Sequence, residues 1–211
     1  MPKGKYGYCE LGVYINTYSN FVWVTKLKNS STGEMTVNSL EQICLDYVKP
    51  LAFMSDNGTH FINWQVEGFC DENNIQIIHT SKYAPWVNGL VESMNNLLLS
   101  HLKRLYAPNL DADPKDVDPS SIPYNWPDPL NKAVFCLNDC IILALNATPC
   151  EILFGMAFHQ DSNILPMTNI QQTTQVDIDN HFTLVDSFHY DTHLRSIMEA
   201  AQGKKAFDAK A

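Results

Sequence analysis

Strand-like and helix-like segments alternate along the first half of the chain, and this alternation constrains the fold more than any other feature of the sequence. Residues 11–15 and 21–27 are rich in β-branched and aromatic side chains and flank the turn-forming residues 16–20. This pattern predicts a β-hairpin. Apolar residues then recur at helical spacing over residues 34–47, and Pro50 ends that segment.

The alternation continues to residue 106. Residues 51–54 and 75–79 read as short buried strands, and residues 63–73 between them read as a helix. Residues 90–106 then form a long predicted helix with leucines along one side. The order β-β-α-β-α-β predicts an α/β domain in which helices cover a sheet.

The second half of the chain is less regular. Residues 107–129 are rich in proline and aspartate and predict an irregular acidic connection, whereas residues 130–145 predict a buried helix. We therefore divide the chain into a core at residues 1–158, a polar linker at residues 159–177 and a helical extension at residues 178–211.

Composition bounds the classes of protein to consider. With 45% hydrophobic residues, the 211-residue chain can bury a core, and its longest apolar run is too short to span a bilayer. The amino terminus lacks the pattern of a secretory signal, so we expect a soluble protein with no membrane partner. Six cysteines without a Cys-x-x-Cys pair suggest neither a zinc knuckle nor a disulfide framework.

Charge is distributed unevenly. The net charge is −9, and residues 106–211 carry six Lys/Arg against fourteen Asp/Glu, whereas residues 1–105 carry eight against nine. Such a chain has no global basic field, so any nucleic-acid binding requires a local basic patch.

Two carboxylates stand at positions suited to metal chemistry. Asp56 follows a predicted strand, and Glu92 lies at the start of a predicted helix. Thirty-five residues separate the two acids. Carboxyl ends of strands in an α/β sheet face the ligand crevice, and paired carboxylates there bind Mg²⁺ or Mn²⁺ for phosphoryl displacement. The alternative is structural, because Asp-Asn-Gly is a common turn and a glutamate in a first helical turn favours the helix dipole.

The residues around both acids resemble a known family. Ser55 to Phe61 (SDNGTHF) and Tyr83 to Glu92 (YAPWVNGLVE) resemble the second-aspartate and glutamate motifs of retroviral and retrotransposon integrases, especially the Gypsy-type retrotransposons of fungi. The spacing of the two acids matches that family too. Residues 126–128 (WPD) and 146–155 (NATPCEILFG) also look like that lineage.

The resemblance implies a ribonuclease H-like fold, with a mixed sheet and helices on both faces. It also implies that Asp56 and Glu92 are catalytic Mg²⁺ or Mn²⁺ ligands for 3′-end processing and strand transfer. The expected partners are nucleic acids, mainly DNA ends and target DNA but also RNA. Further copies of the chain are expected partners as well. The expected location is the nucleus.

One departure from the family concerns its first catalytic aspartate, which lies on a central strand ahead of the region matching residues 2–8. No carboxylate of this chain occupies that place. We therefore expect an amino-terminally truncated core without its first central strand, with impaired metal binding and no activity on its own.

Other residues are candidates for nucleic-acid contacts. Asn57 belongs to the aspartate motif, and Asn96 stands where the family often has a basic residue. The further candidates are Lys82, Tyr83, Trp86 and Lys103. Solvated lysines and aromatic residues that merely anchor a loop are the structural alternatives.

Two other functions remain open. A zinc site at His189 and His193, one helical turn apart with His181 upstream, lacks a third ligand at suitable spacing. A domesticated, non-catalytic module that binds nucleic acid or protein is the main alternative to an integrase, and a remnant without function is the third possibility.

Overall fold

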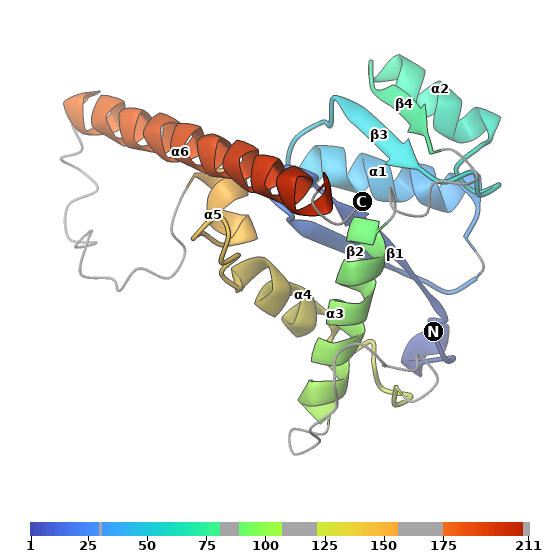
Figure 1. Ribbon diagram of the computed structural model, residues 1–211. Helices are drawn as coiled ribbons and strands as arrows, with labels where there is room; N and C mark the ends of the chain where they lie inside the picture. The colour runs from blue at the N-terminus through green and yellow to red at the C-terminus, as the bar shows by residue number, and fades with distance from the viewer. Residues whose placement is uncertain (30, 81–88, 107–121, 156–174, 209–211) are drawn as a thin grey trace. The chain divides into compact units, whose positions relative to one another are not determined.

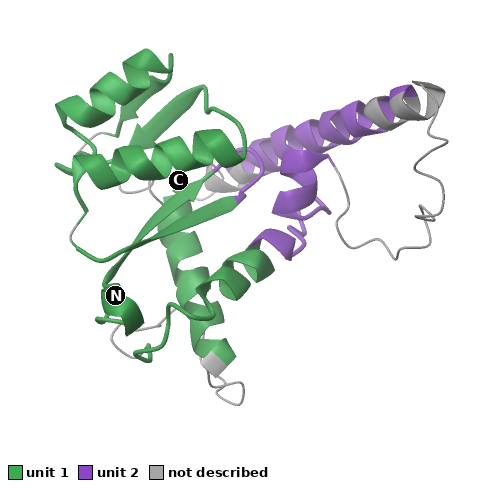
Figure 2. Cartoon of the chain, turned by 180° about the vertical axis from the view of Figure 1, so that it is seen from behind, with its two compact units in different colours: residues 1–15, 22–137 green, residues 16–21, 138–211 purple. Residues whose placement is uncertain are grey.

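The structure is a computed structural model that describes residues 1–29, 31–80, 89–106, 122–155 and 175–208 (Figure 1). The chain forms two compact units, one of residues 1–15 and 22–137 and one of residues 16–21 and 138–211 (Figure 2). None of the described helices is long and apolar enough to cross a bilayer.

After a short 3-10 helix (Lys5–Gly7), the first two strands form the predicted hairpin. Strands β1 (Glu10–Ile15) and β2 (Val22–Leu27) pair antiparallel, with Tyr14 opposite Trp23. In the connecting turn, the side-chain Oδ1 of Asn16 accepts hydrogen bonds from the backbone N–H groups of Tyr18 and Ser19. The turn chemistry read from residues 16–20 therefore produces the expected hairpin.

The next two strands are parallel. Strand β3 (Ala52–Ser55) pairs with β4 (Gln76–His79), and Ser55 lies opposite His79 at their carboxyl ends. Among the described residues the strands form two separate pairs, β1–β2 and β3–β4, and no backbone ladder joins the pairs. The mixture of parallel and antiparallel pairing is as predicted, but here it is divided between the two pairs.

Two helices flank the parallel pair. Helix α1 (Gly33–Asp46) is capped by Thr32, and helix α2 (Trp64–Glu72) is capped by Asn63, whose Oδ1 accepts from two backbone N–H groups at 3.1 Å. Caps of this kind satisfy N–H groups that a helix leaves unpaired. The core beneath these elements consists of Leu40, Phe53, Val66, Cys70 and Ile75.

Helix α3 (Gly89–Tyr106) packs against β1, and helix α4 (Leu130–Asp139) contributes to the same core. The fully buried Trp126 lies in this core, and its indole N–H donates to the carbonyl of Pro2 at 3.0 Å. The buried members of this second core are Leu98, Leu102, Ile122, Trp126, Leu130, Ala133 and Leu137.

The second unit contains helices α5 (Pro149–Phe154) and α6 (Gln175–Asp208), which pack together. Sequence reasoning missed α5, although its signal is present. Thr148 and Glu151 form a reciprocal capping box, and Pro149 follows the cap. Helix α6 begins three residues before the expected helical extension of residues 178–211 and is described as far as Asp208.

The prediction of one helix over residues 130–145 is wrong at its carboxyl end. Helix α4 ends at Asp139, and the chain then turns so that the N–H of Ile142 donates to the carbonyl of Ala147. Asn146 adopts a positive φ of 51° within this turn. Asparagine tolerates this conformation, so the turn competes successfully with a further helical turn.

Candidate active site

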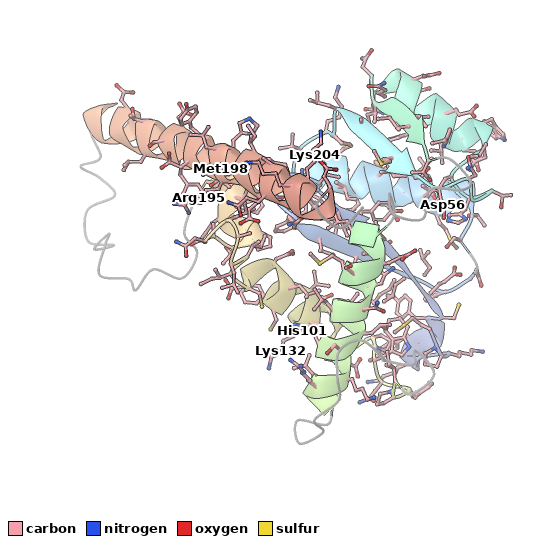
Figure 3. The ribbon with its side chains drawn as sticks, in the orientation of Figure 1. Asp56, His101, Lys132, Arg195, Met198 and Lys204 are labelled. Carbon is pink, nitrogen blue, oxygen red and sulfur yellow. The ribbon has the colours of Figure 1, made fainter. Side chains whose placement is uncertain are left out.

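Asp56 lies immediately after β3, where the strand ends (Figure 3), and it is exposed. Its Oδ1 accepts a hydrogen bond from the backbone N–H of Gly58 at 2.9 Å. This contact closes a turn of the kind that aspartate forms with the backbone two residues on. The carboxylate is thereby held at the carboxyl end of a parallel strand, the edge at which α/β proteins bind ligands.

Gly58 lets this turn close tightly. A Cβ atom at residue 58 would lie 2.7 Å from Cε1 of His60 and 3.0 Å from Oδ1 of Asp56. The His60 ring in turn lies against Phe61, with ring centroids 4.0 Å apart. The glycine of the Asp-Asn-Gly motif is therefore required by the close approach of neighbouring side chains.

The ends of β3 and β4 are tied together beside Asp56. The Asn57 side-chain amide donates to the Thr80 carbonyl at 2.8 Å, and the Thr80 N–H donates to the Ser55 carbonyl at 2.9 Å. Asn57, predicted to contact nucleic acid, thus uses its amide N–H to join the two strands. Sequence reasoning missed Thr80, because a strand partner cannot be read from local spacing.

Glu92 lies in the first turn of α3 and is exposed. At 3.6 residues per turn, Asn96 and Lys103 fall on the same face of α3 as Glu92. Asn96 is exposed and Lys103 is partly buried. Asp56 and Glu92 both belong to the first unit and stand at the ends of two different elements.

Three of the predicted contact residues, Lys82, Tyr83 and Trp86, lie outside the described residues. Within the described part of the chain, no group of three His, Cys, Asp or Glu side chains is placed to hold a metal ion. This holds for the histidine alternative as well: His189 and His193 both lie on α6, and no third ligand joins them there.

Two exposed carboxylates at the ends of a strand and a helix supply hard oxygen ligands. Mg²⁺ prefers such ligands and commonly keeps only one or two protein carboxylates, with water and phosphate oxygens completing its shell. The donor chemistry of Asp56 and Glu92 therefore suits a divalent cation that also holds a phosphate group. It does not suit a structural zinc site, for which thiolate and imidazole ligands are typical.

Comparison with protein families gives a match for the first part of the chain. Residues 1–85 match the integrase core domain family. The Gag-Pro-Pol polyprotein of human T-cell leukemia virus 2 is 33% identical over 111 residues, which are 52% of this chain and 8% of that polyprotein. The Pro-Pol polyprotein of feline foamy virus is 26% identical over 165 residues, 77% of this chain and 12% of that polyprotein. The chain thus spans about a tenth of these relatives.

Solved structures agree with this assignment. The HTLV-2 integrase catalytic core domain in complex with magnesium is 26% identical, with a TM-score of 0.53 over 69% of this chain and 84% of that one. The catalytic core domain of BIV integrase has the same fold, with 22% identity and a TM-score of 0.53 over 69% of this chain and 85% of that one. The chain therefore has the ribonuclease H-like fold of integrase catalytic cores, and its first 85 residues are similar to the integrase core domain found in retroviral Pol polyproteins.

Proposed function

We propose that this chain is the catalytic domain of a retroelement integrase that processes 3′ DNA ends and joins them to target DNA, with Asp56 and Glu92 as its metal ligands. The observation that carries the proposal is the position of Asp56. It stands in a tight exposed turn at the carboxyl end of the parallel pair β3–β4, in a chain homologous to integrases.

The metal would be Mg²⁺ or Mn²⁺, held by Asp56 and Glu92. The related HTLV-2 core was solved in complex with magnesium, which supports this choice. A bound divalent ion activates an attacking water or hydroxyl and stabilises the leaving oxygen of a phosphodiester. The protein supplies the two carboxylates, and the Gly58 N–H fixes the turn that carries one of them.

Asn96 and Lys103 share the face of α3 that carries Glu92, which supports the proposal that they contact DNA near the metal. An ammonium and an amide on that face would bind phosphate oxygens by charge and hydrogen bonding. We include Asn57, Lys82, Tyr83 and Trp86 among the residues that contact nucleic acid, on the strength of their motifs.

We also propose that catalysis requires a third carboxylate besides Asp56 and Glu92. Support comes from the motifs around Asp56 and Glu92, which resemble those of integrases, a family with a further catalytic aspartate. The motif from Tyr83 to Glu92 supports a Gypsy-type retrotransposon as the source, acting in the nucleus and as an oligomer. Relatives solved in dimeric and trimeric forms and as an intasome support the oligomer.

A strand-transfer assay tests the function. We expect the 211-residue chain to be inactive alone, and a chain extended upstream through an additional aspartate-bearing strand to join labelled DNA ends to a plasmid in Mg²⁺ or Mn²⁺. Glu92→Gln abolishes the joining by the extended chain. Glu67→Gln is the matched control, because Glu67 is an exposed acid in the first turn of α2.

Activity of the extended chain that survives Glu92→Gln would refute the assigned site. If neither chain joins DNA while both bind it with a strong salt dependence, the second candidate function, a non-catalytic binding module, is the correct one. The acidic second half of the sequence favours a protein partner for such a module.

A further inference from the structure

We propose that residues 4–8 together with Lys26 and Lys28 form a binding site for single-stranded nucleic acid, distinct from the two carboxylates. In this site, lysines contact phosphates and Tyr6 stacks on an unpaired base. The site rests on the proposed function, because an enzyme that processes and joins DNA ends needs a surface that binds them. We call it the lysine–tyrosine patch, and its members are Lys5, Tyr6, Tyr8, Lys26 and Lys28.

Ammonium groups gather around two tyrosines in this patch. The Nζ atoms of Lys26 and Lys28 each lie 5.5 Å from the centroid of the Tyr8 ring. The Nζ of Lys5 lies 4.9 Å from the centroid of the Tyr6 ring. Tyr6 and Tyr8 are two residues apart in one tight turn, and each ring has at least one lysine ammonium group beside it. Lysine charges interleaved with aromatic rings are typical of grooves that bind single strands.

Acidic side chains offset part of this charge, but Lys26 and Lys28 keep a positive excess. Residues 1–33 contain Lys3, Lys5, Lys26 and Lys28 against a single acid, Glu10, in a chain of net charge −9. The Glu10 carboxylate accepts hydrogen bonds from the N–H and the hydroxyl of Ser31, which hold it there. Asp128 pairs with Lys5 at 3.0 Å, and its hydrogen bond raises the pKa of that lysine. The patch thus provides the local positive charge that a net acidic protein needs in order to bind a polyanion.

The turn that carries Tyr6 is held by backbone hydrogen bonds and by the buried Trp126. The Gly4 N–H donates to the Tyr8 carbonyl at 2.6 Å, and the Lys5 N–H donates to the Tyr124 carbonyl at 2.8 Å. Gly4 itself lies against the indole of the fully buried Trp126, where a Cβ atom would clash. Because the backbone is already ordered, little conformational entropy remains to be lost when a ligand binds.

Tyr6 is held in a conformation that exposes its ring. Its φ of 63° and ψ of 12° lie in the left-handed region, which is uncommon for a residue with a large side chain, and 63% of the residue is exposed. Backbone strain of this kind persists where the surrounding structure enforces it, and it concentrates at functional sites. An exposed aromatic ring can stack on an unpaired base. The lysines beside it can bind the phosphates on either side of that base.

The charge part of the patch is tested by binding at a series of salt concentrations. The 211-residue chain is titrated against fluorescein-labelled oligothymidine, with anisotropy as the readout. Lys26→Gln with Lys28→Gln is expected to reduce the slope of log K against log salt by about 1.4, because each phosphate contact on a single strand contributes about 0.7. The matched control, Lys49→Gln with Lys132→Gln, removes two exposed lysines from elsewhere in the same unit and leaves the slope unchanged.

The stacking part is tested by replacing the ring while keeping the backbone. Asparagine tolerates positive φ, so Tyr6→Asn removes the ring without adding strain. We expect Tyr6→Asn to weaken binding to oligothymidine about five-fold or more and to leave binding to blunt duplex unchanged. Tyr6→Phe retains the affinity for oligothymidine. Tyr190→Gln is the control, because Tyr190 on α6 is also 63% exposed.

Several outcomes overturn the patch. The first is that the chain does not bind oligothymidine, and the second is that the Lys49 and Lys132 control weakens binding as much as the patch variant does. The third is that polyglutamate competes as well as unlabelled oligothymidine, which would indicate a site for any acidic polymer. If patch variants bind oligothymidine normally while Glu92→Gln still abolishes strand transfer, the patch is wrong and the integrase site stands. If the patch variants fail as expected and strand transfer survives Glu92→Gln, the integrase site is wrong and the patch stands.

Discussion

Because Gly58 has no side chain, the turn after β3 has room for both the Asp56 carboxylate and the His60 ring. We predict that Gly58→Ala slows strand transfer by the extended chain about ten- to a hundred-fold, because the added Cβ has to displace either the His60 ring or the Asp56 carboxylate. The free energy of unfolding should change by less than about 1 kcal/mol, since the contacts are with side-chain ends at the surface. Rates from strand-transfer assays and urea denaturation check the two parts.

Gly68→Ala is the control for this prediction. A Cβ atom at Gly68, in α2, meets nothing within 4 Å, and alanine in a helix is favoured over glycine by about 1 kcal/mol. It should therefore stabilise the protein slightly without changing the rate. A Gly58→Ala protein that joins DNA as fast as the unmodified chain would contradict the assigned role of this turn.

His101 on α3 (Figure 3) gives a prediction about pH. Burial, and secondarily the charge of Arg104, lower the pKa of His101 below its usual 6.5. The unfolded chain therefore binds a proton near pH 6.5 that the folded chain does not yet bind, so His101 makes the protein less stable as pH falls through that range. The urea midpoint should drop between pH 7.5 and 5.5, and His101→Gln should reduce the drop. An unchanged drop in this variant would assign it to other groups.

At the scale of elements, the sequence predicted what local signals determine. The turn of residues 16–20 specifies the hairpin, and the helical spacing of apolar residues over residues 34–47 specifies α1. The parallel pairing of β3 with β4 depends on contacts between segments distant in the sequence. The two strands were therefore predictable, but the hydrogen-bonded pairing between them was not. Likewise, the motif located Asp56, but the lysine–tyrosine patch depends on Trp126, more than a hundred residues from the turn that it holds.

Helix α5 shows how one residue controls the packing of an element. Gly155 ends α5 with a φ of 67°, and a Cβ there would clash with Val185 on α6. We predict that Gly155→Ala lowers the stability of the second unit by about 2 kcal/mol, from the left-handed strain and the clash together. Amide hydrogen exchange of α6 residues 183–196 measures the effect.

The Gly155→Asn variant separates the two causes, because asparagine tolerates the backbone conformation but still carries a Cβ. It should recover part of the lost stability. Full recovery of stability would show that the clash contributes nothing. Faster amide exchange in the first unit as well would contradict the prediction that the effect of Gly155→Ala is confined to the second unit.

At the scale of the whole molecule, charge and chemistry are separated along the sequence. The amino-terminal half carries both candidate carboxylates and the lysine–tyrosine patch at nearly balanced charge, whereas residues 106–211 carry most of the negative charge. The net charge of −9 alone argues against nucleic-acid binding, yet it averages over these two parts. Composition and the charge counts came from the sequence, but the placement of Lys26 and Lys28 beside the Tyr8 ring required the structure.

The most direct test of the central claim is Mn²⁺ binding by the extended chain, measured calorimetrically with Asp56→Asn, Glu92→Gln and both changes together. If the two carboxylates hold one ion, each single change should weaken binding by about ten-fold or more, and the double change should fall well short of the product of the two, because a site that has lost one ligand has little left to lose. Effects that simply multiply, or unchanged Mn²⁺ affinity in either variant, would contradict a shared metal site at Asp56 and Glu92.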